Sequence, residues 1–232
     1  MAYKLYHANE IIKYTSGQLQ QLLNHTKLPS YRLGDIILSF PQGLHIPAPV
    51  NTISYKYRTL FKGDTKLGIS LHEGKDSSEG LQILMKLCDE LECPVPDKNT
   101  LVVSLRLGDM IEGSNIKGDN LVNNGGKFST PAGGVRHILS VNEIIEYAKK
   151  CNVSKIVFMG GSHNNAALGE SVNYLKKIMT ICETNRFTCM FFHSGNPDID
   201  LAYMSHASHL LKGPGGFARI GYEIHNFRRS HC

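Results

Sequence analysis

The chain has 232 residues, of which 41% are hydrophobic and 19% are charged. This composition is ordinary for a globular protein and excludes bulk disorder, a collagen repeat and a small disulfide-rich scaffold. The formal net charge of +5 is only mildly basic. Scattered positive charges favour a small phosphate-bearing ligand over a nucleic acid, which usually requires a dense basic stripe. We therefore expect no nucleic-acid partner.

Hydrophobic runs are short along the whole chain. The stretches 36–38 and 156–159 stop far short of the roughly 20 apolar residues of a membrane helix, so we expect no membrane span. The first residues, MAYKLYHANE, lack the apolar core of a signal peptide, which predicts a cytoplasmic protein. The six cysteines form no C-x-x-C pair, so we expect reduced thiols and no zinc site.

Residues 1–98 have an irregular pattern and are predicted to form a small N-terminal domain. Helices are predicted at 16–23 and 78–91, and strands at 35–40 and 67–71. The segment Cys93-Pro94-Val95-Pro96-Asp97 is the predicted linker, because its two prolines break both helix and sheet. The sequence Arg32-Leu33-Gly34-Asp35 recurs as Arg106-Leu107-Gly108-Asp109, which suggests two related half-domains that face each other across a cleft.

Residues 99–232 alternate between strand and helix patterns. Ser140 and Glu143 form a capping box at the start of one helix, and Asp198 is a candidate cap for another. Strands are predicted at 101–105, 155–159, 187–192 and 209–211, and helices at 140–150, 166–181, 198–204 and 217–228. This alternation predicts an α/β fold of Rossmann-like type, a parallel sheet with helices on both faces.

Candidate binding residues follow these strands, at the edge where ligands of open α/β sheets bind. Arg106, Asp109 and Glu112 follow the first strand and Ser162 the second, Asp198 and Asp200 follow the third, and Lys212, Gly213, Gly215 and Gly216 follow the fourth. An arginine, a lysine, two glycine-rich turns and several helix N-termini on one edge suit a diphosphate.

Three of these features have a second interpretation. The guanidinium of Arg106 can donate two N–H groups to one phosphate, or it can form an ion pair with Asp109 that holds the loop in place. Ser162 precedes a histidine, but the surrounding Gly-Gly-Ser-His-Asn lacks the closing glycine of a nucleophile elbow. Asp198-Ile199-Asp200 looks like a metal-binding D-x-D, although acidic residues also favour the first turn of a helix.

Three segments resemble the superfamily of GDP-fucose-dependent fucosyltransferases over residues 100–220. The run from Val102 to Asp109 resembles its H-x-R-R-x-D strand-end motif, with Ser104 in place of the histidine and Leu107 in place of the second arginine. Residues 156–162 resemble the strand of that superfamily that ends in a Ser-Asp-Asp element. Residues 198–218 resemble its signature of an aspartate, a hydrophobic helix, an apolar strand and a turn of small residues with a phenylalanine. Separately, residues 32–41 resemble the N-terminal segment of heptosyltransferase-type enzymes.

The resemblance implies a glycosyltransferase B architecture of two Rossmann-like halves. Residues 1–98 would be the acceptor-side domain and residues 99–232 the nucleotide-sugar-binding domain. It implies that Arg106 grips the donor phosphates, that Asp109 orders the loop, and that the regions of Asp198 and Gly215-Gly216-Phe217 hold nucleoside and phosphate. Inversion at the sugar carbon without a metal is also implied, with a GDP-sugar favoured as co-substrate and no further cofactor.

The sequence therefore predicts a glycosyltransferase that moves a sugar, with fucose as one candidate, from a nucleotide diphosphate to a glycan hydroxyl. Arg106, Lys212 and helix N-termini would stabilise the departing diphosphate. Asp109, Glu112 and Asp119 are candidates for the general base, and the glycine-rich loop 113–134 is long enough for an acceptor site or a lid. The alternatives are a non-catalytic nucleotide-sugar-binding module and a metal-dependent D-x-D transferase.

Overall fold

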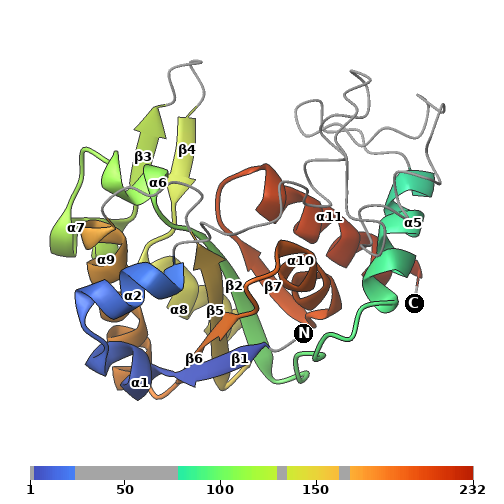
Figure 1. Cartoon of the computed structure of the whole chain (residues 1–232), viewed down its shortest axis with the longest axis horizontal. Coiled ribbons are helices and arrows are strands. Elements are labelled where there is room, and N and C mark those ends of the chain that lie inside the picture. The colour runs from blue at the N-terminus through green and yellow to red at the C-terminus, as the bar shows by residue number, and fades with distance from the viewer. Residues whose placement is uncertain (1–2, 24–77, 130–134, 162–167, 232) are drawn as a thin grey trace.

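The computed structural model describes residues 3–23, 78–129, 135–161 and 168–231. The strands predicted at 35–40 and 67–71, and the repeated motif at 32–35, lie outside these ranges. The described residues form an α/β fold in which helices cover both faces of a five-stranded sheet (Figure 1). The predicted fold class is confirmed at this level, whereas the division into two Rossmann-like halves stays a prediction.

The main sheet is mixed, with the strand order β1-β6-β5-β2-β7. Strands β2, β5, β6 and β7 run parallel as predicted, and β1 pairs antiparallel with β6. The strands are β1 (Lys4–His7), β2 (Thr100–Arg106), β5 (Lys155–Gly161), β6 (Thr188–His193) and β7 (His209–Lys212). The sequence did not predict β1, because its residues are half-exposed and form no apolar run.

Alternate residues of the strands enter two separate hydrophobic cores. In β2, Leu101, Val103 and Leu105 pack into the first core and Val102 into the second. The first core lies under α1 (Ala8–Lys13), α2 (Ser16–Leu23), α8 (Val141–Lys150) and α9 (Gly169–Thr184). The second lies under α5 (Ser78–Asp89), α10 (Pro197–His206) and α11 (Gly216–His231). Both faces of the parallel strands are therefore covered, as their continuous apolar runs require.

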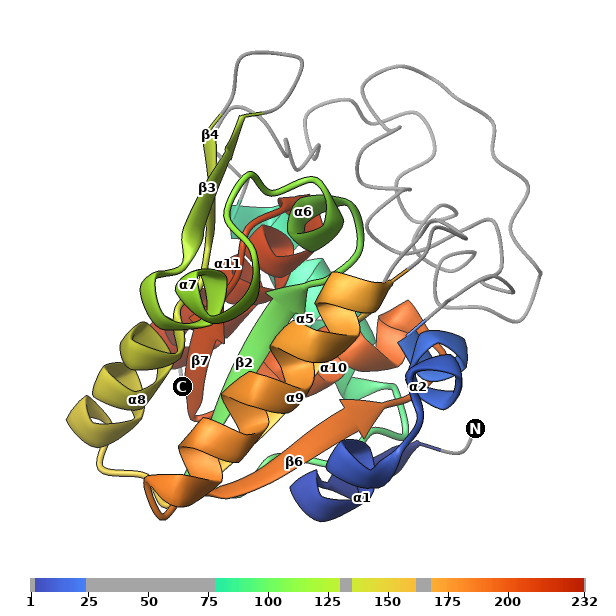
Figure 2. The same ribbon diagram turned by 90° about the vertical axis from the view of Figure 1, so that its left-hand side faces the viewer.

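The described parts of residues 1–98 belong to the same layers as the rest of the chain. Strand β1 is part of the main sheet, and α5 packs against α10 and α11 on its second face. Helices α1 and α2 pack against α9 on the first face (Figure 2). The predicted domain boundary between residues 98 and 99 stays a prediction.

The glycine-rich stretch 113–134 is structured over most of its described length, so the expectation of one long loop was wrong. It follows the short helix α6 (Asp109–Glu112) and contains α7 (Gly118–Asn124) and the strand β3 (Gly126–Ser129), which pairs with β4 (Val135–Ile138). Gly118 and Gly125 have φ angles of 60° and 66° and lie at the two ends of α7. The glycines mark the ends of elements because this backbone conformation strains other residues.

The helix caps agree with the sequence in one case and differ in the other. Ser140 and Glu143 form the predicted capping box of α8. Helix α10 is capped by Asn196 and not by Asp198, which was the predicted cap. The Asn196 side chain accepts the N–H of Asp198 at 2.9 Å, and Pro197 occupies the first helical position, where its missing N–H costs no hydrogen bond.

The chain reverses its direction across the sheet between β2 and β7. From β2 it proceeds outward through β5 to β6, and it then returns to place β7 on the other side of β2. In doubly wound sheets, ligands bind beyond the carboxyl ends of the strands at such a switch point. The fold therefore directs attention to the end of β2, where Arg106 lies.

Candidate functional site

The carboxyl ends of the four parallel strands lie along one side of the sheet, here called the carboxyl edge. Their last residues are Gly161 in β5, Arg106 in β2, His193 in β6 and Lys212 in β7. Parallel pairing of these strands places the residues that follow them at the same edge, as the sequence predicted. Ser162 lies outside the described residues.

Arg106 and Asp109 form a two-pronged ion pair at the end of β2. The guanidinium donates from Nε to Oδ1 of Asp109 at 3.1 Å and from Nη2 to Oδ2 at 2.7 Å. Both side chains are partly exposed, at 28% for Arg106 and 44% for Asp109. The pair uses one edge of the guanidinium, whose other terminal nitrogen, Nη1, lies beside the backbone of Gly215.

The turn of residues 213–216 brings its backbone against the end of β2. The Gly213 N–H donates to the Ser104 carbonyl at 2.7 Å, and a Cβ on Gly213 would lie 2.4 Å from that oxygen. Gly215 has a φ of 116°, and a Cβ there would lie 3.0 Å from Nη1 of Arg106. Both positions therefore require glycine. The turn leads into α11 at Gly216, where the first N–H groups of the helix have no partner within it.

Arg106 also borders a small cavity of about 10 Å³, close to the volume that one water molecule needs. Its walls include Leu105, Ile138, Leu139, Tyr174 and Pro214. The cavity lies between the ends of β2 and β7, at the switch point of the sheet.

All three candidate bases bind other groups of the protein. Glu112 caps α9, because its carboxylate accepts the backbone N–H of Ser171 at 2.8 Å and that of Glu170 at 3.4 Å. Asp119 forms an ion pair with Lys177 at 2.6 Å. Asp109 is the candidate base that the structure places in contact with Arg106.

The acidic residues after β6 lie at the start of α10 and bind within their own loop. Ser194 Oγ lies 2.7 Å from Asp200 Oδ1, and it accepts the N–H of Asn196 at 3.0 Å. Burial, assisted by the nearby charge of Asp198, raises the pKa of the Asp200 carboxyl to about 7. Burial also lowers the pKa of the neighbouring His193. Asp200 is thus a carboxyl group that takes up a proton near neutral pH.

The remaining predicted residues lie on the second face of the sheet. The ammonium of Lys212 lies 4.6 Å from the ring centre of Tyr222 on α11, so a cation–π contact holds it there. Phe217 is half-buried and packs against the second core. Among the residues that the structure describes, no group of three or more His, Cys, Asp or Glu side chains could hold a metal ion.

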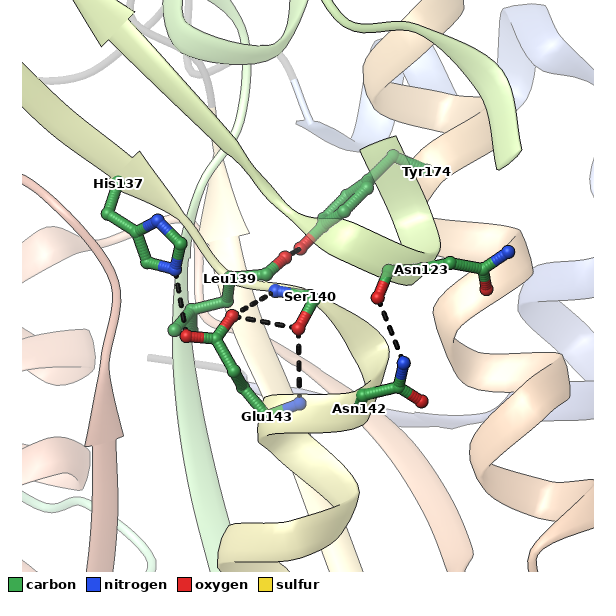
Figure 3. Close-up of polar contacts among 7 residues, drawn as sticks. All are labelled: Asn123, His137, Leu139, Ser140, Asn142, Glu143 and Tyr174. Atoms are coloured by element: carbon green, nitrogen blue, oxygen red, sulfur yellow. Dashed lines mark hydrogen bonds and ion pairs between the residues drawn. The ribbon is translucent and has the colours of Figure 1, made fainter. Parts of the chain in front are cut away.

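The sequence did not single out a polar cluster that borders the cavity. His137 on β4, together with Ser140, binds Glu143 on α8, and the Tyr174 hydroxyl donates to the Leu139 carbonyl (Figure 3). The capping box was visible in the sequence, whereas the partners Tyr174 and His137 were not, because the first is 35 residues from its acceptor and the second lies outside the box motif.

Comparisons with known proteins found no match, since no family model, no curated protein and no solved structure is significantly similar to this chain. Over the ranges that the structure describes, no helix is long and apolar enough to cross a membrane.

Proposed function

We propose that this protein is an inverting glycosyltransferase of the B type that transfers a sugar from a nucleoside diphosphate, with GDP as the favoured nucleotide, to a hydroxyl group of a glycan. In this proposal residues 99–232 bind the donor. The observation that carries it is the position of Arg106 beside the Gly213–Gly216 turn at the switch point of the sheet.

The charge and shape of this region support a diphosphate as the ligand. Arg106 Nη1 lies beside Gly215, the residue directly before α11, and the first amides of a helix have no partner within it. Together they can bind phosphate oxygens by charge-assisted hydrogen bonds. Gly215 is half-buried and has no side chain, so a phosphate can approach the backbone there, whereas Gly213 is buried against the Ser104 carbonyl.

The chemical step requires two groups. The acceptor oxygen forms a bond to the anomeric carbon as the bond from that carbon to the diphosphate breaks, and the acceptor proton passes to a base. Arg106 stabilises the negative charge that develops on the departing diphosphate. We assign the base to Asp109, because its partner is Arg106 at the proposed site, whereas Glu112 and Asp119 bind α9.

A thermal-shift panel of GDP, UDP, ADP, dTDP and their sugars tests the proposal, because a ligand that binds the native state raises its melting temperature. We expect GDP and a GDP-sugar to give the largest shift, and mass spectrometry to detect transfer of the sugar to an added glycan or to water. Arg106→Ala should lose the shift, whereas the matched control Arg229→Ala, at an exposed position near the end of α11, should keep it.

Two other outcomes separate the alternatives. Nucleotide binding without any transfer or hydrolysis would identify a non-catalytic binding module. Loss of activity in excess EDTA, restored by manganese, would assign the reaction to Asp198 and Asp200 as metal ligands. We expect activity to survive EDTA, because both carboxyl groups lie in the first turn of α10 and Asp200 binds Ser194.

A further inference from the structure

The β3–β4 hairpin lies apart from the main sheet and extends beyond its carboxyl edge. It forms a separate two-stranded sheet. Figures 1 and 2 show it rising past α6, at the end of the molecule toward which β2 points. An isolated two-stranded hairpin is at best marginally stable in water, so contacts with the rest of the protein must hold it in this position.

A hydrogen-bonded cluster holds the base of this hairpin to α8 (Figure 3). The carboxylate of Glu143 accepts from His137 Nε2 at 2.8 Å through Oε1, and from the N–H of Ser140 at 2.7 Å through Oε2. Partial burial alone would raise the pKa of Glu143, but the hydrogen bonds from Ser140 and His137 hold it below its usual value. These hydrogen bonds therefore favour the charged form of the carboxylate.

The same base forms one wall of the cavity beside Arg106. Ile138 and Leu139 follow His137 directly and line the cavity. The Tyr174 hydroxyl fixes the Leu139 carbonyl at 2.5 Å. On the other side, the backbone of Gly125 approaches the Ile138 carbonyl so closely that a Cβ would lie 2.4 Å from it. A displacement of the hairpin therefore moves Ile138 and Leu139, which line the cavity beside Arg106.

We propose that His137 is a positioning residue, which holds the hairpin through Glu143 and thereby couples the order of the hairpin to occupancy of the site at Arg106. His137 belongs to β4, whereas Ser140 and Leu139 lie beyond its end. Its bond therefore fixes the strand itself to α8. The coupling to a bound ligand rests on the proposed function, whereas the role of His137 in holding the hairpin does not depend on it.

Amide hydrogen exchange of the ligand-free protein tests the hold on the hairpin. His137 and Glu143 are 47% and 43% exposed, so their bond contributes little to global stability. We expect His137→Ala to leave the melting temperature nearly unchanged and to speed exchange in residues 135–138 by about two- to fivefold. His137→Gln retains an N–H donor and should restore slow exchange. Exchange in His137→Ala equal to that of the wild type would overturn the role of His137.

Exchange in the presence of GDP or inorganic pyrophosphate tests the coupling. We expect either ligand to slow exchange at Ile138 and Leu139 in the wild type, and His137→Ala to bind it several-fold more weakly, because coupling between two sites is reciprocal. The control His231→Ala, at the exposed end of α11, should bind normally.

Binding that leaves exchange at the base of the hairpin unchanged would overturn the coupling while the proposed function stands. Absence of binding would overturn the coupling together with the proposed function. In that case the ligand-free exchange still decides whether His137 holds the hairpin.

Discussion

The two parts of the carboxyl edge differ in charge and in the partners of their polar groups. At the ends of β2 and β7, the guanidinium of Arg106 is paired with Asp109 and lies beside Gly215, directly before α11. At the end of β6, Asp198 and Asp200 lie at the start of α10, where Ser194 donates to the Asp200 carboxyl group and Asn196 accepts the backbone N–H of Asp198. In the first part, Nη1 of Arg106 and the N-terminus of α11 can bind an anion, whereas the second part carries two carboxyl groups, so a diphosphate is expected at β2 and β7.

The largest expected effect comes from Arg106. Arg106→Ala removes both the positive charge and the two parallel N–H donors, whereas Arg106→Lys keeps the charge alone. The rate of sugar transfer should therefore fall further in Arg106→Ala than in Arg106→Lys. Loss of one group that stabilises a developing charge typically lowers the rate by about 10²- to 10³-fold, or roughly 3 to 4 kcal/mol. Transfer rates of the two variants, measured with the donor that the panel identifies, check this expectation.

The melting temperatures of Arg106→Ala and Asp109→Asn separate catalysis from structure. If Arg106 served only to pin Asp109, both variants would lower the melting temperature by similar amounts, and transfer by the folded fraction would stay near normal. A folded Arg106→Ala protein with normal transfer would remove Arg106 from the active site.

The glycine turn should tolerate substitution far less than a glycine elsewhere. Gly213→Ala places a methyl group 2.4 Å from the Ser104 carbonyl oxygen, so the backbone must shift. We expect a loss of about 1 to 3 kcal/mol in the free energy of unfolding, as for other overpacked sites. Gly17→Ala is the matched control, because nothing lies within 4 Å of its new methyl group and α2 favours alanine. Equal stability of the two variants by chemical denaturation would contradict the close approach.

The Asp200 carboxyl group at the end of β6 should make the free energy of unfolding depend on pH. The pKa of Asp200 is raised to about 7, so the folded state binds a proton that the unfolded chain releases near pH 4. Its stabilising contribution is complete below the unfolded pKa and is lost as the pH rises through about 7.

Asp200→Asn, which stays neutral, should lack this loss between pH 5 and pH 8. The difference between the melting curves of the wild type and this variant isolates Asp200 from His193, whose lowered pKa acts in the opposite direction. Parallel curves for the two proteins would show that Asp200 titrates at its ordinary pKa.

Periodicity predicted the parallel strands of residues 99–232 well because each of them contains a continuous apolar run. In β5, for example, Ile156, Val157, Phe158 and Met159 are all buried. The stretch 113–134 was misjudged because its glycines were interpreted as flexibility, although Gly118 and Gly125 each mark an end of α7. Strand β1 is half-exposed and has no such run, and β6 fixes it by pairing.

The sequence could predict which residues of the candidate site share one edge, because parallel strands end on the same side of a sheet. The sequence placed Arg106 and the glycine turn on one edge, and it allowed either a phosphate or Asp109 as the partner of Arg106. The structure shows the pairing with Asp109 and leaves Nη1 beside the turn, so both roles are compatible. The capping of α9 by Glu112 joins residues 59 apart, and no local pattern encodes such a contact.

A crystal structure with bound GDP tests the central claim most directly. We predict that the phosphates lie within hydrogen-bond distance of Arg106 Nη1 or of the backbone amides of the Gly213–Gly216 turn. Phosphates bound at the opposite, amino edge of the sheet, or at the end of β6 beside Asp198 and Asp200, would contradict the account.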